Sequence, residues 1–211
     1  MKKLLKYGFL LIFAVLVLWG GWSLLHPAKD NDGFLVVLDP GHGGDDPGAI
    51  VGEAMEKDIN LAVALLVQEQ LSEQEEVTVV MTRDQDVFLP LTDRAELANR
   101  ENADLYVSIH ANALENDDSF AGVFTFYHPD KSSDKAVAKT IQSAVISACG
   151  GLDRGIRSED YAVLRETDMP AVLVETGFMT CPEELNRLLD TDYQKLLAHG
   201  IAQGILAFRE D

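Results

Sequence analysis

The stretch FLVVLDPGHGG, Phe34 to Gly44, indicates how the chain folds. Its first five residues form a continuous apolar run, which predicts a short buried strand. The Asp-Pro-Gly-His-Gly-Gly sequence that follows is typical of a loop. A strand that runs directly into such a loop places His42 just beyond a strand end, where a functional side chain is accessible.

Strand and helix patterns alternate along the rest of the chain. The segment from Glu56 to Leu71 has no glycine or proline and begins with acidic residues, which the helix dipole favours, so it predicts the first helix. Further strands are predicted at 77–81, 105–109, 122–127, 162–164 and 171–174, and further helices at 92–102 with Thr92 as N-cap, 133–148, 182–189 and 192–208. The alternation predicts an α/β fold in three layers, a mixed and mostly parallel sheet flanked by helices.

The N-terminal region differs from the rest. Three lysines within the first six residues precede an uncharged stretch of 19 residues, Tyr7 to Leu25. As a helix this stretch spans roughly 28 Å, close to the hydrocarbon thickness of about 30 Å. Its far flank carries tryptophans in place of a small-residue cleavage site, which favours an uncleaved anchor over a signal peptide. If the segment were instead a cleaved signal peptide, the protein would be secreted. The predicted organisation is a cytoplasmic N-terminus at 1–6, a transmembrane helix at 7–25, a linker at 26–33 and an extracytoplasmic domain at 34–211.

The predicted domain is strongly acidic. Residues 34–211 carry 13 basic and 33 acidic side chains, a formal net charge of −20. Nucleic acid is therefore repelled and is excluded as a partner. The two cysteines, Cys149 and Cys181, have no CxxC spacing, so neither a cysteine-based metal site nor a disulfide framework is indicated.

Three candidate site residues follow predicted strands, namely His42, His110 and Glu175. In open α/β sheets, ligands bind beyond the carboxyl ends of the strands, so these side chains can meet at one edge. Catalytic zinc typically takes three ligands from histidines and carboxylates, and two histidines leave one ligand to be a carboxylate. Glu56, at the start of the first helix, is the best candidate for it. The spacing alone leaves three competitors open: Asp45, Asp46 and Glu53.

Other polar residues are expected to have structural roles. Asp39, in an Asp-Pro strand exit, is expected to fix the loop rather than to orient a metal ligand. Arg83 with Asp84 and Asp86 predicts an ion-pair and turn cluster. No chemistry is assigned to the remaining histidines, His26, His128 and His199.

Five short motifs occur in order along the chain. They are LDPGHGG at 38–44, EKD at 56–58, TRDQD at 82–86, SIHAN at 108–112 and MPAVLVETGF at 169–178. Through these motifs, residues 35–208 resemble the zinc-dependent N-acetylmuramoyl-L-alanine amidases of the family often called amidase type 3. The resemblance implies that His42, Glu56 and His110 bind Zn²⁺ and that Glu175 is the catalytic carboxylate.

The resemblance also implies a reaction. The expected activity is hydrolysis of the amide bond between N-acetylmuramic acid and L-alanine in peptidoglycan, with Glu175 moving protons. Thr176 stands where many relatives carry an aliphatic residue, and the short segment between His110 and Gly122 implies that the inhibitory helical insertion of some relatives is absent. Two alternatives are a zinc peptidase cutting within the stem peptide and a non-catalytic wall-binding module, against which Glu175 argues.

Overall fold

Six strands form the central sheet of the protein. The computed structural model describes residues 33–115 and 117–210, in which the sheet has the strand order β4-β1-β5-β8-β6-β7 and a separate hairpin is made by β2 and β3. The strands are β1 (Phe34–Pro40), β2 (Ile50–Val51), β3 (Ala54–Met55), β4 (Val77–Met81), β5 (Leu105–Asn112), β6 (Val123–Tyr127), β7 (Asp153–Ser158) and β8 (Ala171–Phe178). Strands β4, β1, β5 and β8 run parallel, and β6 and β7 run in the opposite direction. The sheet is therefore mixed and mostly parallel.

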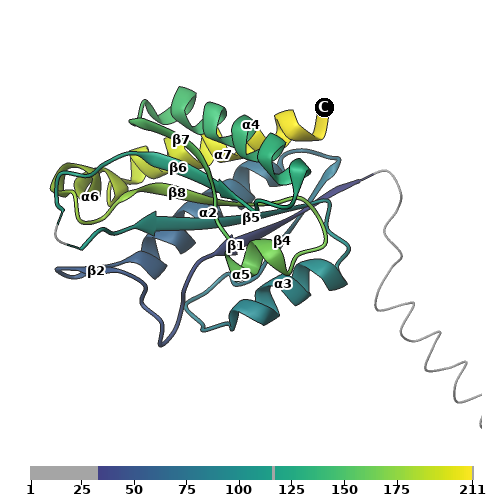
Figure 1. The fold of residues 1–211 in the computed structure, drawn as a ribbon, viewed down its shortest axis with the longest axis horizontal. Coiled ribbons are helices and arrows are strands. Elements are labelled where there is room, and N and C mark those ends of the chain that lie inside the picture. The colour runs from purple at the N-terminus through teal and green to yellow at the C-terminus, as the bar shows by residue number, and fades with distance from the viewer. Residues whose placement is uncertain (1–32, 116, 211) are drawn as a thin grey trace, which may run out of the picture. The chain divides into compact units, whose positions relative to one another are not determined.

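Helices cover both faces of this sheet. They are α2 (Glu56–Ser72), α3 (Leu91–Arg100), α4 (Ser132–Cys149), α5 (Ala162–Arg165), α6 (Pro182–Leu188) and α7 (Thr191–Glu210). Figure 1 shows α2, α4 and α7 on one face and α3 and α5 on the other. The predicted three-layer α/β fold is confirmed. The transmembrane helix predicted at 7–25 lies outside the described residues, and within them no helix is both long enough and apolar enough to cross a membrane.

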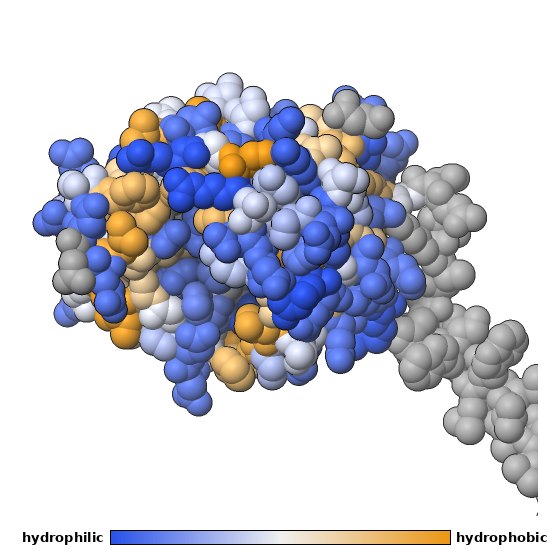
Figure 2. Space-filling view, viewed as in Figure 1, coloured by the Kyte–Doolittle hydropathy of each residue, from blue (hydrophilic) through white to orange (hydrophobic). Residues whose placement is uncertain are grey.

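Each face of the sheet has its own apolar core. Val36 and Leu38 of β1 pack into the core under α2, α4 and α7, whereas Val37 packs into the core under α3 and α5. Because successive side chains of a strand point to opposite faces, Asp39 lies on the same face as Val37. Hydrophilic side chains dominate the outer surface seen in Figure 2, and apolar ones occupy smaller areas.

The same alternation brings the candidate site residues to one face. Tyr106 of β5 and Leu173 of β8 belong to the core under α3 and α5. Steps of two residues along these strands lead to His110 and to Glu175, which are paired in the register of β5 with β8. The two side chains therefore project side by side from the α3 and α5 face, near the carboxyl ends of their strands.

A buried carboxylate network holds the end of β1. Asp39, only 1% exposed, accepts hydrogen bonds from Thr82 Oγ1 (2.7 Å), Arg94 Nη1 (2.7 Å), Tyr106 Oη (2.6 Å) and Ser108 Oγ (2.8 Å). Burial raises the pKa of Asp39, but the Arg94 guanidinium and the donated hydrogen bonds outweigh it and lower the pKa below its usual value. Asp39 therefore fixes the end of β1, from which the loop that the sequence expected it to fix begins.

Arginine side chains hold the loop that follows β1. Arg94 donates to Pro40 O (2.9 Å) and His42 O (2.7 Å), and Arg83 donates to Pro40 O (2.9 Å) and Gly41 O (2.9 Å). The ion pair predicted for Arg83 is wrong, because the carboxylate of Asp86 pairs with Lys57 Nζ at 2.7 Å. Arg83 serves the structure through backbone carbonyls instead.

Several predicted elements differ from the observed ones. The segment predicted as a strand at 162–164 is the one-turn helix α5, which turns Val163 and Leu164 into the core. Helix α3 begins at Leu91 after Pro90 with no side-chain cap, so Thr92 is not the N-cap. Strand β7 was not predicted, because most of its residues are polar and exposed at the sheet edge and show no apolar alternation. Strands β5 and β8 extend past their predicted ends, so His110 and Glu175 lie within them.

Candidate metal centre

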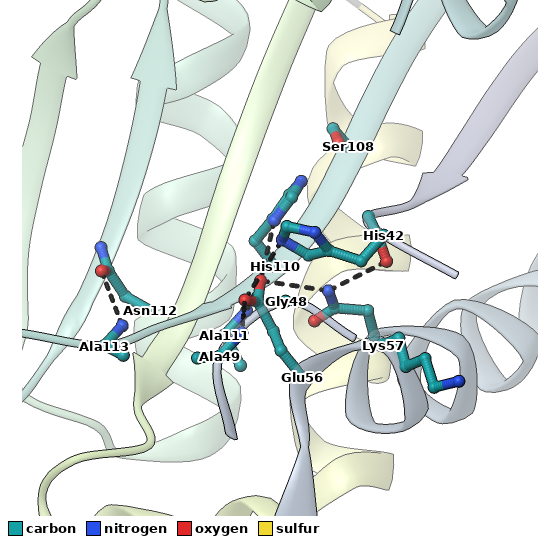
Figure 3. Close-up of polar contacts among 12 residues, drawn as sticks. His42, Gly48, Ala49, Glu56, Lys57, Ser108, His110, Ala111, Asn112 and Ala113 are labelled. Carbon is teal, nitrogen blue, oxygen red and sulfur yellow. Dashed lines mark hydrogen bonds and ion pairs between the residues drawn. The ribbon is translucent and has the colours of Figure 1, made fainter. Parts of the chain in front are cut away.

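Two histidines and a glutamate from three segments converge beside the sheet. His42 comes from the loop after β1, Glu56 from the first residue of α2 and His110 from β5, and one potential ligand atom of each lies within 4.8 Å of the others. Glu56 Oε1 lies 2.9 Å from His110 Nδ1, and its Oε2 lies 3.2 Å from His42 Nε2. Figure 3 shows the two imidazoles and the carboxylate pointing toward one another. This arrangement has the donors of a three-ligand metal site.

A second carboxylate orients His42. Asp46 Oδ2 lies 2.8 Å from His42 Nδ1, and Asp46 Oδ1 accepts a hydrogen bond from the Gly48 amide at 3.1 Å. The bond to Nδ1 leaves Nε2 directed at Glu56, which is the arrangement typical of metal-binding histidines. Asp46 therefore lies behind the ligand group, and neither Asp45 nor Glu53 belongs to the group of described residues that can hold a metal.

Backbone conformation brings His42 into this position. Its φ angle is +62°, in the left-handed region that is uncommon for residues other than glycine. Such a conformation costs on the order of 1 kcal/mol and persists only where surrounding contacts hold it. The hydrogen bonds of His42 to Arg94 through the carbonyl and to Asp46 through the ring are those contacts.

Two glycines leave room for the ligand side chains. A Cβ atom on Gly41 would lie 2.1 Å from His110 Cε1, so the imidazole packs directly on the Gly41 backbone. A Cβ atom on Gly48 would lie 2.6 Å from Glu56 Oε2 and 2.7 Å from His42 Cδ2. Any larger residue at either position displaces a ligand side chain. This close approach explains the glycines at 41 and 48.

Hydrogen bonds and charge keep Glu56 ionised. Its carboxylate accepts hydrogen bonds from the Ala49 amide (3.0 Å), the Ala111 amide (3.3 Å) and Asn60 Nδ2 (3.3 Å). Burial raises the pKa of Glu56, but the hydrogen bonds and charges of His110 and His42 lower it far below its usual value. In turn Glu56 and Asp46 outweigh the effect of burial on His42 and raise the pKa of its imidazole to about 9.

Glu175 lies beside the ligand group but does not join it. The side chain is 8% exposed, and its Oε2 atom has no hydrogen-bond partner among the described residues. Burial raises the pKa of Glu175 to about 7, although His110 opposes the shift. A buried carboxyl group with an unpaired oxygen and a pKa near neutrality is suited to proton transfer.

An open cavity of about 490 Å³ connects these groups. His42, His110 and Glu175 are among its polar lining residues. Its apolar lining comes from the β4–α3 connection, the first residue of α3 and the segment around α5, and includes Phe88, Leu89, Leu91, Tyr161, Ala162 and Val163. The volume falls within the range of about 300–1,000 Å³ typical of ligand pockets.

Some site residues were not predicted from the sequence. Thr176 Oγ1 donates to His110 O at 2.8 Å and so fixes the backbone of a ligand residue. Arg94 holds His42, and its role depends on contacts between distant segments, which no local pattern reveals. Asp46 had a usable signal, because it follows His42 by four residues in the same loop, although the sequence suggested it only as a competing ligand.

Comparisons with known proteins identify the family. Residues 36–207 match the family model described as N-acetylmuramoyl-L-alanine amidase. The chain therefore belongs to the N-acetylmuramoyl-L-alanine amidase family.

Two relatives illustrate the likeness. The germination-specific N-acetylmuramoyl-L-alanine amidase of Bacillus subtilis (strain 168) is 33% identical over 99% of this chain and 96% of its own length. The crystal structure of N-acetylmuramoyl-L-alanine amidase from Clostridium difficile 630 is 40% identical and aligns with a TM-score of 0.84 over 86% of this chain and 99% of its own. Both likenesses cover nearly the whole described domain.

Metal binding is expected to release protons. Because the pKa of His42 is raised to about 9 without a metal, its imidazole is protonated at neutral pH and a metal ion must displace that proton. Between pH 6 and 8 the apparent affinity for Zn²⁺ should therefore rise about tenfold for each pH unit. Calorimetric titration of the metal-free full chain in buffers of different ionisation enthalpy measures both the affinity and the protons released.

Two variants make this measurement specific. His42→Ala should abolish the proton release and greatly weaken binding. His199→Gln, which changes an exposed histidine on α7, should bind Zn²⁺ as the natural chain does. Equal binding by all three proteins would show that the ion is held elsewhere.

Proposed function

We propose that this chain is a zinc-dependent hydrolase that cleaves the amide bond between N-acetylmuramic acid and L-alanine in peptidoglycan. The observation that carries the proposal is the convergence of His42, Glu56 and His110 directly beside the buried Glu175. Membership of the amidase family supports the choice of this amide bond.

The ligand group fits zinc. Two imidazoles and one carboxylate are among the ligand sets of catalytic zinc sites, which keep a further position open. The group adjoins an open cavity rather than a closed core, as a catalytic site requires. The hydrogen bond from His42 to the Asp46 carboxylate supplies the outer support that zinc-binding histidines usually have. His42, Glu56 and His110 would hold the ion.

Glu175 is assigned the proton transfers. When bound, a zinc ion lowers the pKa of water toward about 7 and polarises a carbonyl group. Glu175, with its unpaired Oε2, accepts a proton from the attacking water and donates it to the departing amino group of L-alanine. Burial raises the pKa of Glu175 in the metal-free chain, and a raised pKa favours a carboxyl group that first accepts and then donates a proton.

The apolar side of the cavity is assigned to substrate positioning. Phe88 is 54% exposed, Leu91 58% and Tyr161 38%, although all three are large apolar or aromatic residues. Because they line the same cavity as His42, His110 and Glu175, we assign them to packing against the alkyl parts of the lactyl and alanyl groups. Such contacts hold the scissile bond between the ligand group and Glu175.

Digestion of purified peptidoglycan tests the reaction. We expect the full chain, kept in detergent and loaded with Zn²⁺, to release free amino groups on L-alanine and no new reducing sugars. New amino termini on other stem-peptide residues would instead identify a peptidase. Tight binding to the polymer without any new ends, under conditions where an authentic amidase works, would identify a wall-binding module.

Substitution of Glu175 tests its assigned role. Glu175→Gln keeps the size and the hydrogen-bonding capacity but cannot exchange the proton, so kcat should fall by about 10²–10⁴-fold. Zinc content should stay at the natural level, because Glu175 is not part of the ligand group. Glu96→Gln, an exposed residue of α3, is the matched control and should keep full activity. Unchanged turnover in the Glu175 variant would remove the residue from the reaction.

The N-terminal segment is proposed to anchor the domain outside the cytoplasm. The support is in the sequence, where three lysines precede the apolar stretch at 7–25. An uncleaved anchor predicts that the mature protein remains in the membrane fraction with its N-terminus before residue 7. Mass spectrometry of the mature N-terminus measures this, and a terminus near residue 27 would show that the segment is a cleaved signal peptide.

A further inference from the structure

The face of the sheet that carries Glu175 continues past it to the β7 edge. Glu175 is directly opposite Phe124 of β6, and Phe126 of β6 is directly opposite Arg157 of β7. Paired residues of neighbouring strands share a face, and so do residues two apart on one strand. The Arg157 side chain therefore lies on the same face as the catalytic carboxylate, two strands away.

Aromatic rings hold Arg157 and its neighbour Arg154 over this face. The guanidinium carbon of Arg157 lies 4.2 Å from the centre of the Phe124 ring, and that of Arg154 lies 4.4 Å from the centre of the Phe120 ring. Arg154 Nε also donates to Ala121 O at 2.7 Å. Stacking on aromatic faces restricts the guanidinium groups while leaving their outer edges free to donate hydrogen bonds.

Arg157 has no carboxylate partner among the described residues. Among the residues that the structure describes, no hydrogen bond or ion pair engages its guanidinium, although acidic side chains outnumber basic ones by 20 in residues 34–211. Some exposed cations of the domain pair with carboxylates, such as Arg165 with Asp160 and Lys195 with Asp192. Others, such as Lys135 and Arg154, have a ring contact and no ion pair among the described residues. Five guanidinium donors thus remain available on a ring-stacked cation two strands from Glu175.

The distance across the sheet from Glu175 to Arg157 suits the peptide part of the substrate. Two strand spacings amount to about 10 Å, and an extended peptide covers about 3.3–3.6 Å for each residue. A group two or three residues beyond the scissile bond therefore reaches Arg157 when that bond lies at Glu175. A free carboxylate on either of these residues would lie within reach of Arg157, and guanidinium binds a free carboxylate through two parallel hydrogen bonds.

We propose that Arg157, with Arg154 beside it, binds a carboxylate on the second or third residue of the stem peptide and so selects substrates with that carboxylate free. This inference rests on the proposed amidase function and adds to it a determinant of substrate choice. Arg157 contacts the substrate at a distance from the reacting bond. It affects recognition and takes no part in proton transfer.

Two synthetic muramoyl tripeptides test the proposal. One has free carboxylates on its second and third residues, and in the other these carboxylates are amidated. With the full chain loaded with Zn²⁺, kcat/KM should be about tenfold higher for the free substrate, since a hydrogen bond to a charged group contributes about that factor.

Arg157→Gln should lose this preference through a higher KM for the free substrate, and its kcat/KM for the amidated one should stay within about twofold. Arg157→Lys, which keeps the charge, should recover part of the preference.

Control measurements separate recognition from folding and from the reaction itself. Arg100→Gln, an exposed arginine on α3, should keep the natural preference, and all variants should have the natural melting temperature and zinc content. Two outcomes would overturn the carboxylate site and leave the amidase function intact. In one, Arg157→Gln lowers kcat/KM equally for both substrates. In the other, the natural chain has the same kcat/KM for both substrates. A natural chain that releases L-alanine amino groups from neither substrate nor from peptidoglycan would overturn both.

Discussion

The buried carboxylate of Asp39 is the contact on which the geometry of the site depends. It accepts hydrogen bonds from residues of the β4–α3 connection, α3 and β5, and Arg94, its charged partner, is itself only 2% exposed. Removing one partner of a buried ion pair typically costs about 3–5 kcal/mol, because the remaining charge is left uncompensated. Through Arg94 the same network holds the carbonyl of His42, whose φ angle is unfavourable without such support. The buried charge of Asp39 therefore helps to fix the position of the ligand residue His42 through Arg94.

Much of this fold could be predicted from local patterns. Segments with a strong apolar run or a long helical pattern, such as β1, β4 and α2, lie close to their predicted positions, because burial on both faces of a strand or on one face of a helix leaves a clear pattern. The β7 strand and α5 helix could not be predicted, because partners distant in the sequence determine them. β7 is polar and pairs with β6 at the edge of the sheet, and α5 has a single turn whose apolar residues suit either a strand or a helix.

Prediction of the site shows the same division. His42, His110 and Glu175 could be recognised because residues near strand ends gather at one edge of a parallel sheet, and the register pairs His110 with Glu175. The choice of Glu56 over Asp46 needed the resemblance, because both are acidic residues near His42 in the sequence. The structure separates them by geometry, since Glu56 faces both imidazoles while Asp46 bonds the outer nitrogen of one. Thr176 shows how little local sequence reveals of such support, because its bond to the His110 carbonyl spans two strands.

The two glutamates at the centre differ because their surroundings differ. Both are largely buried, and burial alone raises the pKa of a carboxyl group. Glu56 lies between two imidazoles and accepts three further hydrogen bonds, so its pKa is lowered and it stays ionised. One oxygen of Glu175 has no partner in the part of the chain that the structure describes, so burial dominates and its pKa rises to about 7. An ionised carboxylate suits permanent binding of a cation, and a carboxyl group near neutrality suits repeated proton exchange. Glu56 at the start of α2 and Glu175 on β8 have the same type of side chain, and their different surroundings give them different roles.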